Sequence, residues 1–204
     1  MPDRSGVGGS DALILRSAIH HPMRVKGLRR SFTGLLGEKP MSMLSAGAIA
    51  PDFQLAATSG EKFSLSPALS RGPVLLAFFK VSCPTCQYTF PFLERLHEQL
   101  QSRGIQVAGI VQDKAPEGRR FASTLGIKFP ILVDEAPYRI SRAYGLLHVP
   151  SLFLIKADGR IALSGDGFCK ADLLAIHKSL AKTLGATPPA LFLANEKIPD
   201  FKPG

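Results

Sequence analysis

Two of the three cysteines, Cys83 and Cys86, stand three positions apart in KVSCPTCQYTFP, residues 80–91. Such a pair can exchange disulfides, hold a metal ion or belong to an inert core. A continuous apolar run precedes Cys83 and apolar residues at helical spacing follow it, so Cys83 should begin a helix. Unpaired N–H groups and the helix dipole stabilise a thiolate there, and Pro84 suits the first helical turn. This setting favours a redox pair in which Cys83 attacks and Cys86, on the same face, resolves.

A metal site would need ligands that the pair does not supply. A structural zinc site takes four ligands, and the sequence has neither a second C-x-x-C nor an H-x-x-x-H motif. His148 stands near an expected strand start on the same edge as the pair, so Cys83, Cys86 and His148 are candidate ligands for Cu(I), which prefers soft donors. Cys169 stands alone before the last expected helix, and we expect it to be a spectator rather than a third redox cysteine.

The elements that must position the pair alternate along the chain. Apolar runs predict strands at 73–79, 105–111, 131–133, 152–155 and 160–163. Apolar residues at helical spacing, each series closed by a glycine, predict helices at 83–103, 116–125, 138–144 and 171–184. Alternating residues at 53–55 and 63–65 flank a turn and predict an N-terminal β-hairpin. This order predicts an α/β fold with a central mixed β-sheet flanked by helices.

Three segments differ in character. Residues 1–45 show no sustained period and are interrupted by glycines, so we expect a mobile basic arm. Met41 and Met43 at its end offer later start sites. Residues 46–185 carry the predicted domain, and residues 186–204 form a Pro-rich C-terminal tail that we expect to lie over the surface.

The bulk composition limits the classes of partner and location. The formal net charge is +9, but basic and aromatic residues are not interleaved, so we expect no nucleic-acid partner. No run approaches about 18 apolar residues and the basic N-terminus lacks a signal-peptide core, so we expect no membrane contact. Three cysteines are too few for a secreted disulfide framework. The expected location is therefore cytoplasmic.

Five motifs resemble the redoxin superfamily of alkyl hydroperoxide reductase and thiol-specific antioxidant (AhpC/TSA) proteins. Over about residues 48–184 they follow in family order: APDFQL at 50–55, CPTC at 83–86 with Pro91, FPILVD at 129–134, AYG at 143–145, and VPSLFLI at 149–155. The CPTC segment is similar to that of the thioredoxin-like TlpA/ResA-type members. The resemblance implies a thioredoxin fold, two-cysteine disulfide exchange and a cis bond between Val149 and Pro150 beside the cysteines.

The chain departs from the family pattern at several positions. Ala77 and Thr89 stand where relatives carry an aspartate and a glutamate, which are thought to handle protons for the resolving thiol. Deprotonation of Cys86 should therefore need water or another group. Ser82 replaces a tryptophan usual in thioredoxins. Lys80 stands where a peroxiredoxin would have Thr or Ser, which disfavours peroxidase chemistry.

Together these features predict a cytoplasmic thiol–disulfide oxidoreductase without a cofactor, in which Cys83 and Cys86 are catalytic and Pro84, Val149 and Pro150 support them. Its expected partners are a protein or small-molecule disulfide and a dithiol electron donor. One alternative is an antioxidant thiol peroxidase, in which peroxide oxidises Cys83 to a sulfenic acid and Cys86 closes the disulfide. A less favoured alternative is the non-enzymatic copper chaperone.

Overall fold

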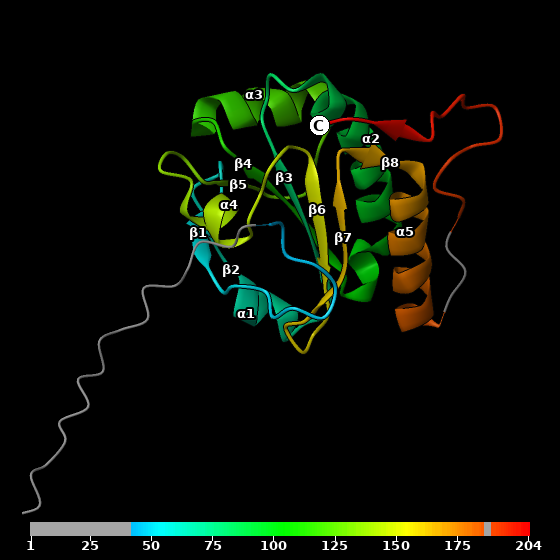
Figure 1. Cartoon of the computed structure of the whole chain (residues 1–204), viewed down its shortest axis with the longest axis horizontal. Helices are drawn as coiled ribbons and strands as arrows, with labels where there is room; N and C mark the ends of the chain where they lie inside the picture. Colours follow the sequence, from blue (N-terminus) through cyan, green and yellow to red (C-terminus); the bar gives the residue numbers. More distant parts are fainter. Residues whose placement is uncertain (1–41, 186–188) are drawn as a thin grey trace, which may run out of the picture. The chain divides into compact units, whose positions relative to one another are not determined.

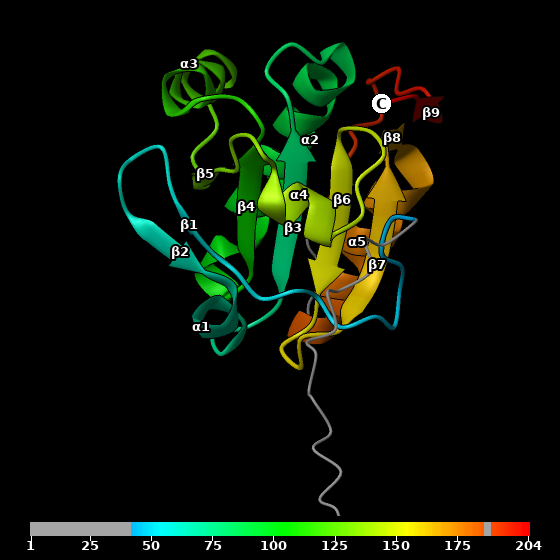
Figure 2. The same ribbon diagram turned by 60° about the vertical axis from the view of Figure 1, so that its left-hand side comes forward.

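A five-stranded mixed sheet forms the centre of the fold in the computed structural model, which describes residues 42–185 and 189–204 (Figure 1). Its strands are β3 (Val74–Phe79), β4 (Gln106–Val111), β5 (Ile131–Val133), β6 (Ser151–Ile155) and β7 (Ile161–Asp166). Their order across the sheet is β5-β4-β3-β6-β7, as Figure 2 shows face-on. The first three strands run parallel, β6 runs antiparallel to β3, and β7 runs antiparallel to β6. The predicted mixed sheet is confirmed.

In the part of the chain that the structure describes, five α-helices cover the two faces of the sheet. They are α1 (Leu65–Leu69), α2 (Pro84–Leu100), α3 (Ala115–Leu125), α4 (Arg139–Ala143) and α5 (Lys170–Leu184). Alternate side chains of a strand point to opposite faces, and all six residues of β3 are buried. Leu75, Ala77 and Phe79 belong to the core under α2, α3 and α5. Val74, Leu76 and Phe78 belong to a second core with α1, α4 and the N-terminal hairpin.

Local signals place the ends of these elements close to the predicted positions. The hairpin consists of β1 (Gln54–Ala56) and β2 (Lys62–Ser64), paired antiparallel. A short 3-10 turn, Gln101–Arg103, follows α2, and Gly104 then adopts a φ of 81°, a left-handed conformation that glycine reaches without a Cβ clash. The sequence did not predict α1, because five residues are too few to establish a helical period.

The predicted N-terminal arm covers residues 1–45. Residues 1–41 of the predicted arm lie outside the described residues. Leu44 contacts the domain, because its N–H donates to the Tyr144 carbonyl at 3.1 Å, and Met43 packs against the second core. Met43 and Leu44, at the end of the predicted arm, therefore pack against the domain.

The described part of the tail, residues 189–204, packs against the domain. Its strand β9 (Phe201–Lys202) pairs antiparallel with β8 (Phe168–Cys169), and Leu191 is buried. This part of the tail thus adds a small sheet that the sequence did not predict. Among the described residues, no helix combines the length and apolar character that crossing a membrane requires.

Candidate active site

The redox pair lies at the start of α2, after the short loop that follows β3. Cys83 is the N-cap residue of α2 and keeps an extended backbone, while Pro84 occupies the first helical turn. The Cys86 N–H donates to the Cys83 sulfur at 3.2 Å, so one of the unpaired N–H groups at the start of the helix is aimed at this sulfur. The predicted placement of both cysteines on one helix start is confirmed.

The two thiols differ in their contact with solvent. Cys86 is 0% exposed, whereas Cys83 is partly exposed. Burial raises the pKa of the Cys86 thiol well above its usual range, and a hydrogen bond with Cys83 and the charge of Asp113 raise this pKa further. Cys86 is therefore held protonated, and Cys83 presents the sulfur that an incoming molecule can reach.

Val149 and Pro150 lie directly beside the pair. The peptide bond between them is cis, as the family resemblance implied. The Cys83 thiol donates to the Val149 carbonyl oxygen at 3.3 Å. The structure thus brings together all five residues predicted for the site, and the roles of these residues remain predictions.

His148 is engaged with another partner. Its Nδ1 lies 3.0 Å from Oδ2 of Asp166, at the end of β7. Within residues 42–185 and 189–204, no three His, Cys, Asp or Glu side chains gather closely enough to hold a metal ion. The predicted set of Cys83, Cys86 and His148 is therefore not assembled as a Cu(I) site.

Cys169 lies in β8, where its register partner is Phe201 of the tail, and it precedes the first residue of α5. All three cysteines are free thiols in this structure. The predicted pairing of Cys83 with Cys86 in the oxidised protein, with Cys169 left free, remains a prediction.

Comparison with known proteins assigns this arrangement to a family. The model of the AhpC/TSA family matches residues 46–164, which is more than half of the chain. The chain belongs to the AhpC/TSA family. A curated relative, the thiol-disulfide oxidoreductase ResA of Bacillus subtilis, is 26% identical over 140 residues, which cover 68% of this chain and 77% of the relative.

Solved structures show the fold of this AhpC/TSA protein. One, from Chlorobium tepidum and proposed to be the thiol:disulfide interchange protein DsbE, superposes with a TM-score of 0.62 at 28% identity, covering 71% of this chain and 100% of that one. The thioredoxin domain of a thiol-disulfide oxidoreductase from Bacteroides vulgatus gives a TM-score of 0.61 at 17% identity, covering 69% and 99%. The thioredoxin fold is confirmed.

Asp113 is a residue near the pair that the sequence analysis missed. It lies two residues beyond β4, and its Oδ2 accepts the Val81 N–H at 2.9 Å. Its negative charge contributes to the raised pKa of the Cys86 thiol. A signal was available, because the carboxyl ends of the parallel strands β3 and β4 meet at one edge of the sheet. An acid just after the second strand should therefore lie near the cysteines that follow the first.

Ala77 and Thr89, at the two positions where the family pattern has an acid, are both buried. Ala77 lies in the core, and the Thr89 hydroxyl donates to the Thr85 carbonyl at 2.7 Å. Asp113, in the loop after β4, is instead a carboxylate whose charge acts on the Cys86 thiol.

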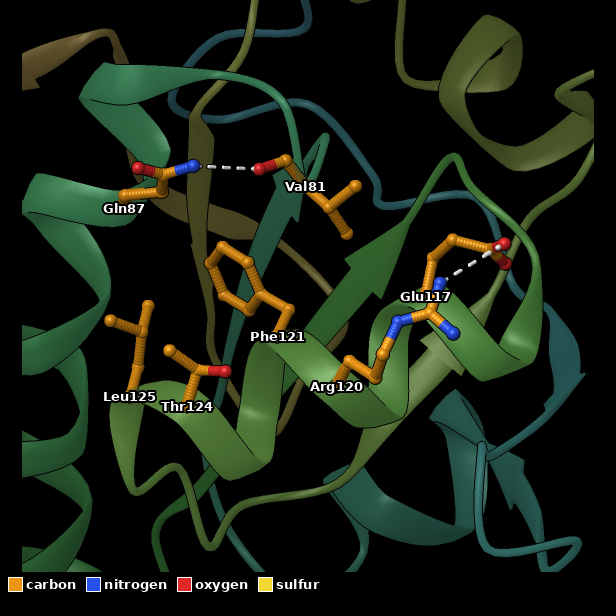
Figure 3. A pocket seen from close by; sticks show the side chains of 7 residues that line it. All are labelled: Val81, Gln87, Glu117, Arg120, Phe121, Thr124 and Leu125. Atoms are coloured by element: carbon orange, nitrogen blue, oxygen red, sulfur yellow. Dashed lines mark hydrogen bonds and ion pairs between the residues drawn. The ribbon is translucent and has the colours of Figure 1, made fainter.

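A groove of about 420 Å³ lies beside the start of α2. Its lining residues come from the loop before Cys83, from α2 and from α3 (Figure 3): Val81, Gln87, Glu117, Arg120, Phe121, Thr124 and Leu125. The Gln87 side chain donates to the Val81 carbonyl at 2.9 Å and Arg120 pairs with Glu117 at 3.5 Å, so polar groups border an apolar floor. Val81 and Gln87, which stand before and after the two cysteines in the chain, both line this groove.

Proposed function

We infer that the chain is a thiol–disulfide oxidoreductase that uses Cys83 and Cys86 as its redox pair. One observation carries this proposal. A partly exposed sulfur at the N-terminus of α2 accepts the N–H of a second, fully buried cysteine one turn later. Membership of the AhpC/TSA family and similarity to a thiol-disulfide oxidoreductase support it.

The reaction proceeds in two exchanges. The Cys83 thiolate attacks one sulfur of a substrate disulfide, a bond forms between Cys83 and that sulfur, and the other substrate sulfur leaves as a thiolate that takes up a proton. Cys86 then loses its proton and attacks the Cys83 sulfur. The Cys83–Cys86 disulfide forms, and the second substrate thiol is released. The substrate gains two electrons and two protons, which the protein loses, and a dithiol donor must return them.

The geometry gives each supporting residue a part in these exchanges. The Cys86 N–H stabilises negative charge on Cys83, and the Val149 carbonyl accepts a hydrogen bond from the Cys83 thiol of the resting form. Pro84 begins α2 without requiring an N–H partner. Burial raises the pKa of the Cys86 thiol, so little thiolate forms there near neutral pH. Cys86 therefore resolves the mixed disulfide and does not start the reaction.

Three cysteine variants test this assignment. Cys83→Ser should abolish reduction of insulin disulfides, because no reachable sulfur remains at the start of α2. Cys86→Ser should react once and accumulate as a mixed disulfide that intact-mass measurement detects. Cys169→Ser is the matched control and should reduce insulin at the wild-type rate. Mixed-disulfide formation by Cys83→Ser at the wild-type rate would refute the assigned roles.

The same samples separate disulfide exchange from peroxide reduction. In the peroxidase alternative, Cys83 would attack the O–O bond, become a sulfenic acid and release water or an alcohol, and Cys86 would then condense with it. We expect disulfides to oxidise the reduced protein much faster than hydrogen peroxide does. The opposite order of rates would favour the antioxidant peroxidase.

We propose further that the substrates are protein or small-molecule disulfides and that the protein acts in the cytoplasm. The small number of cysteines supports this location. Fractionation of cells that produce the full chain, with marker proteins for each compartment, tests it. Recovery with an extracytoplasmic marker would contradict the proposal.

A further inference from the structure

The tail follows α2 back toward the redox pair. The Phe192 ring packs against Phe92, with ring centroids 5.1 Å apart, and Leu191 is 1% exposed. Arg95, in the middle of α2, holds Glu196 through two hydrogen bonds of 2.8 and 2.9 Å. These contacts fix the tail along the outer side of the helix that carries Cys86.

The tail end, defined here as residues 200–204, lies at the start of α2. The Lys202 ammonium lies over the Tyr88 ring, 5.1 Å from its centroid. The Thr85 hydroxyl, between the two cysteines, donates to the Pro203 carbonyl at 2.6 Å. Thr85 is 8% exposed, so this hydrogen bond is sheltered from water. The tail end is thus bonded to the C-x-x-C motif itself.

The tail end also reaches Val149, whose carbonyl accepts a hydrogen bond from the Cys83 thiol. A methyl group added to Gly204 would come within 2.7 Å of the Val149 carbonyl oxygen and 3.0 Å of the His148 Cβ. Distances this short leave no room for another chain between Gly204 and Val149. The backbone beside Val149 is therefore already occupied by the protein's own residues.

The groove described above lies by α3 and the loop before Cys83. In Figure 2, α3 and the C-terminus lie on opposite sides of α2. The groove lined by Val81, Gln87 and Phe121 lies on the α3 side (Figure 3). The tail end therefore covers the Val149 side of the pair, whereas the groove lies by Val81 and α3.

We propose that the tail end determines which disulfides reach Cys83, by closing the Val149 side of the redox pair to polypeptide substrates. This proposal rests on the thiol–disulfide exchange proposed above. A small disulfide needs only the exposed part of the Cys83 sulfur. A disulfide held within a polypeptide brings a backbone with it, and on the Val149 side that backbone collides with residues 200–204. Polypeptide substrates must then approach from another side or displace the tail end.

The test compares the full chain with a chain that ends at Pro199. This truncation keeps the Phe192 and Glu196 contacts, and the pre-reduced proteins are mixed in single turnover with insulin or with dithionitrobenzoate. In the full chain, the hydrogen bond from Thr85 to Pro203 must break before the tail end can move aside. A neutral hydrogen bond contributes about 1 kcal/mol, so its loss corresponds to an increase of about fivefold in the rate. We therefore expect the insulin rate to rise by about fivefold or more, while the dithionitrobenzoate rate stays within about twofold. Equal insulin rates, or equal increases for both substrates, would overturn the proposal.

Substitutions at Thr85 test the same contact without removing residues. Thr85→Val removes the donor to Pro203 and should raise the insulin rate of the full chain. Thr85→Ser keeps a donor hydroxyl and should change that rate less. In the chain that ends at Pro199, Thr85→Val should add nothing, because the acceptor is gone. An equal effect of Thr85→Val in both chains would overturn the proposal.

The rates with dithionitrobenzoate and with insulin test thiol–disulfide exchange and the role of the tail end separately. If neither the full nor the shortened chain reduces dithionitrobenzoate, thiol–disulfide exchange itself is wrong and the role of the tail end falls with it. If both chains reduce dithionitrobenzoate and both reduce insulin at the same rate, the exchange function stands and the role of the tail end is refuted. Circular dichroism of the shortened chain shows whether it is folded, and the Thr85 variants decide the matter if it is not.

Discussion

Cys83 and Cys86 are one helical turn apart, yet their sulfurs lie in different surroundings. The Cys83 sulfur is partly exposed and takes part in hydrogen bonds with the Cys86 N–H and the Val149 carbonyl. The Cys86 sulfur is fully buried, and burial raises the pKa of its thiol. We therefore expect hydrogen bonding and burial at these two residues, rather than their spacing, to set the order in which they react.

The buried Cys86 thiol should make the stability of the reduced protein fall at alkaline pH. The folded-state pKa is raised, so the stabilising effect is complete below the ordinary thiol pKa of about 8.5 and is lost as the pH rises toward the folded-state value. The free energy of unfolding should decrease by at most about 1.4 kcal/mol per pH unit from this group. Urea denaturation between pH 7 and 10 measures it.

Cys86→Ala is the control for this measurement. Burial also raises the pKa of Tyr144, but this residue is present in both proteins, and its effect cancels in the comparison. The difference in slope between the wild type and Cys86→Ala should appear above about pH 8.5. Parallel pH profiles would show that Cys86 ionises normally in the folded protein.

Asp113 should affect the pH dependence of the step in which Cys86 attacks the mixed disulfide at Cys83. Its negative charge helps to raise the pKa of the Cys86 thiol, and its Oδ2 accepts the Val81 N–H. Asp113→Asn removes the charge and keeps an oxygen acceptor, so the pKa of Cys86 should fall by less than about one unit. The rate of resolution rises with pH as Cys86 ionises, and this profile should move to lower pH in the variant.

Stopped-flow decay of the mixed disulfide, followed across a pH series, measures this shift. Glu61→Gln, in the turn of the N-terminal hairpin, removes one negative charge from an exposed position and should leave the profile unchanged. An unshifted profile in Asp113→Asn, or a shift to higher pH, would contradict an electrostatic role for Asp113.

At the scale of elements, α2 joins the sheet, the redox pair and the tail. Its buried face enters the core with β3 and β4, and its first turn carries Cys86. Its outer side holds the tail through Arg95 and Glu196. Hydrogen bonds to the Arg95 side chain and the Leu193 N–H lower the pKa of Glu196 to about 2. The tail is therefore attached to the catalytic helix by a carboxylate that stays ionised in moderate acid.

Loss of this carboxylate should loosen the tail without unfolding the domain. Glu196→Gln weakens the hydrogen bonds to Arg95 and to the Leu193 N–H, so amide exchange at Leu193 and Lys202 should become faster. Cleavage by trypsin after Lys197 should also become faster. In the wild type the contact is complete above the ordinary carboxyl pKa near 4.5 and is lost as the pH falls through about 2. Faster exchange in the β3 core as well would instead indicate global destabilisation.

At the scale of the whole molecule, the domain closes around two cores on either side of one sheet. Residues 42–45 contribute to the second core, through Leu44 and Met43, at one end of the described segment. The tail seals the outer side of α2 at the other end of the chain. Both ends of the described sequence therefore take part in the packed domain.

Deletion of the N-terminal arm should reveal where the domain begins. A chain that starts at Met41 keeps the hydrogen bond from Leu44 to Tyr144 and should unfold cooperatively with the stability and insulin rate of the full chain. A chain that starts at Ala46 loses this hydrogen bond and the packing of Met43, and should be less stable by about 1–3 kcal/mol. Urea denaturation compares the three chains. A loss of cooperativity already in the chain that starts at Met41 would show that the arm is part of the fold.

The sequence by itself determined the local features of this protein. The apolar run at β3, the helical spacing after Cys83 and the turn at Ala157–Gly159 each depend on residues close together in the chain, and all three lie where they were predicted. The position of Cys83 at a helix start followed from the same patterns. The resemblance to a family added the cis bond at Pro150, which no local pattern of the residues predicted.

Only the tertiary structure decided which distant residues meet the redox pair. Asp113 reaches Val81 because β3 and β4 are neighbours in the sheet, and His148 pairs with Asp166 instead of joining a metal site. The two residues of β9 are too few to show a period, so their pairing with β8 could not be predicted. The contact of Thr85 with Pro203, 118 residues later, depends on how α2, β8 and the tail pack together. Such contacts arise from packing between elements, and residue spacing within an element carries no information about them.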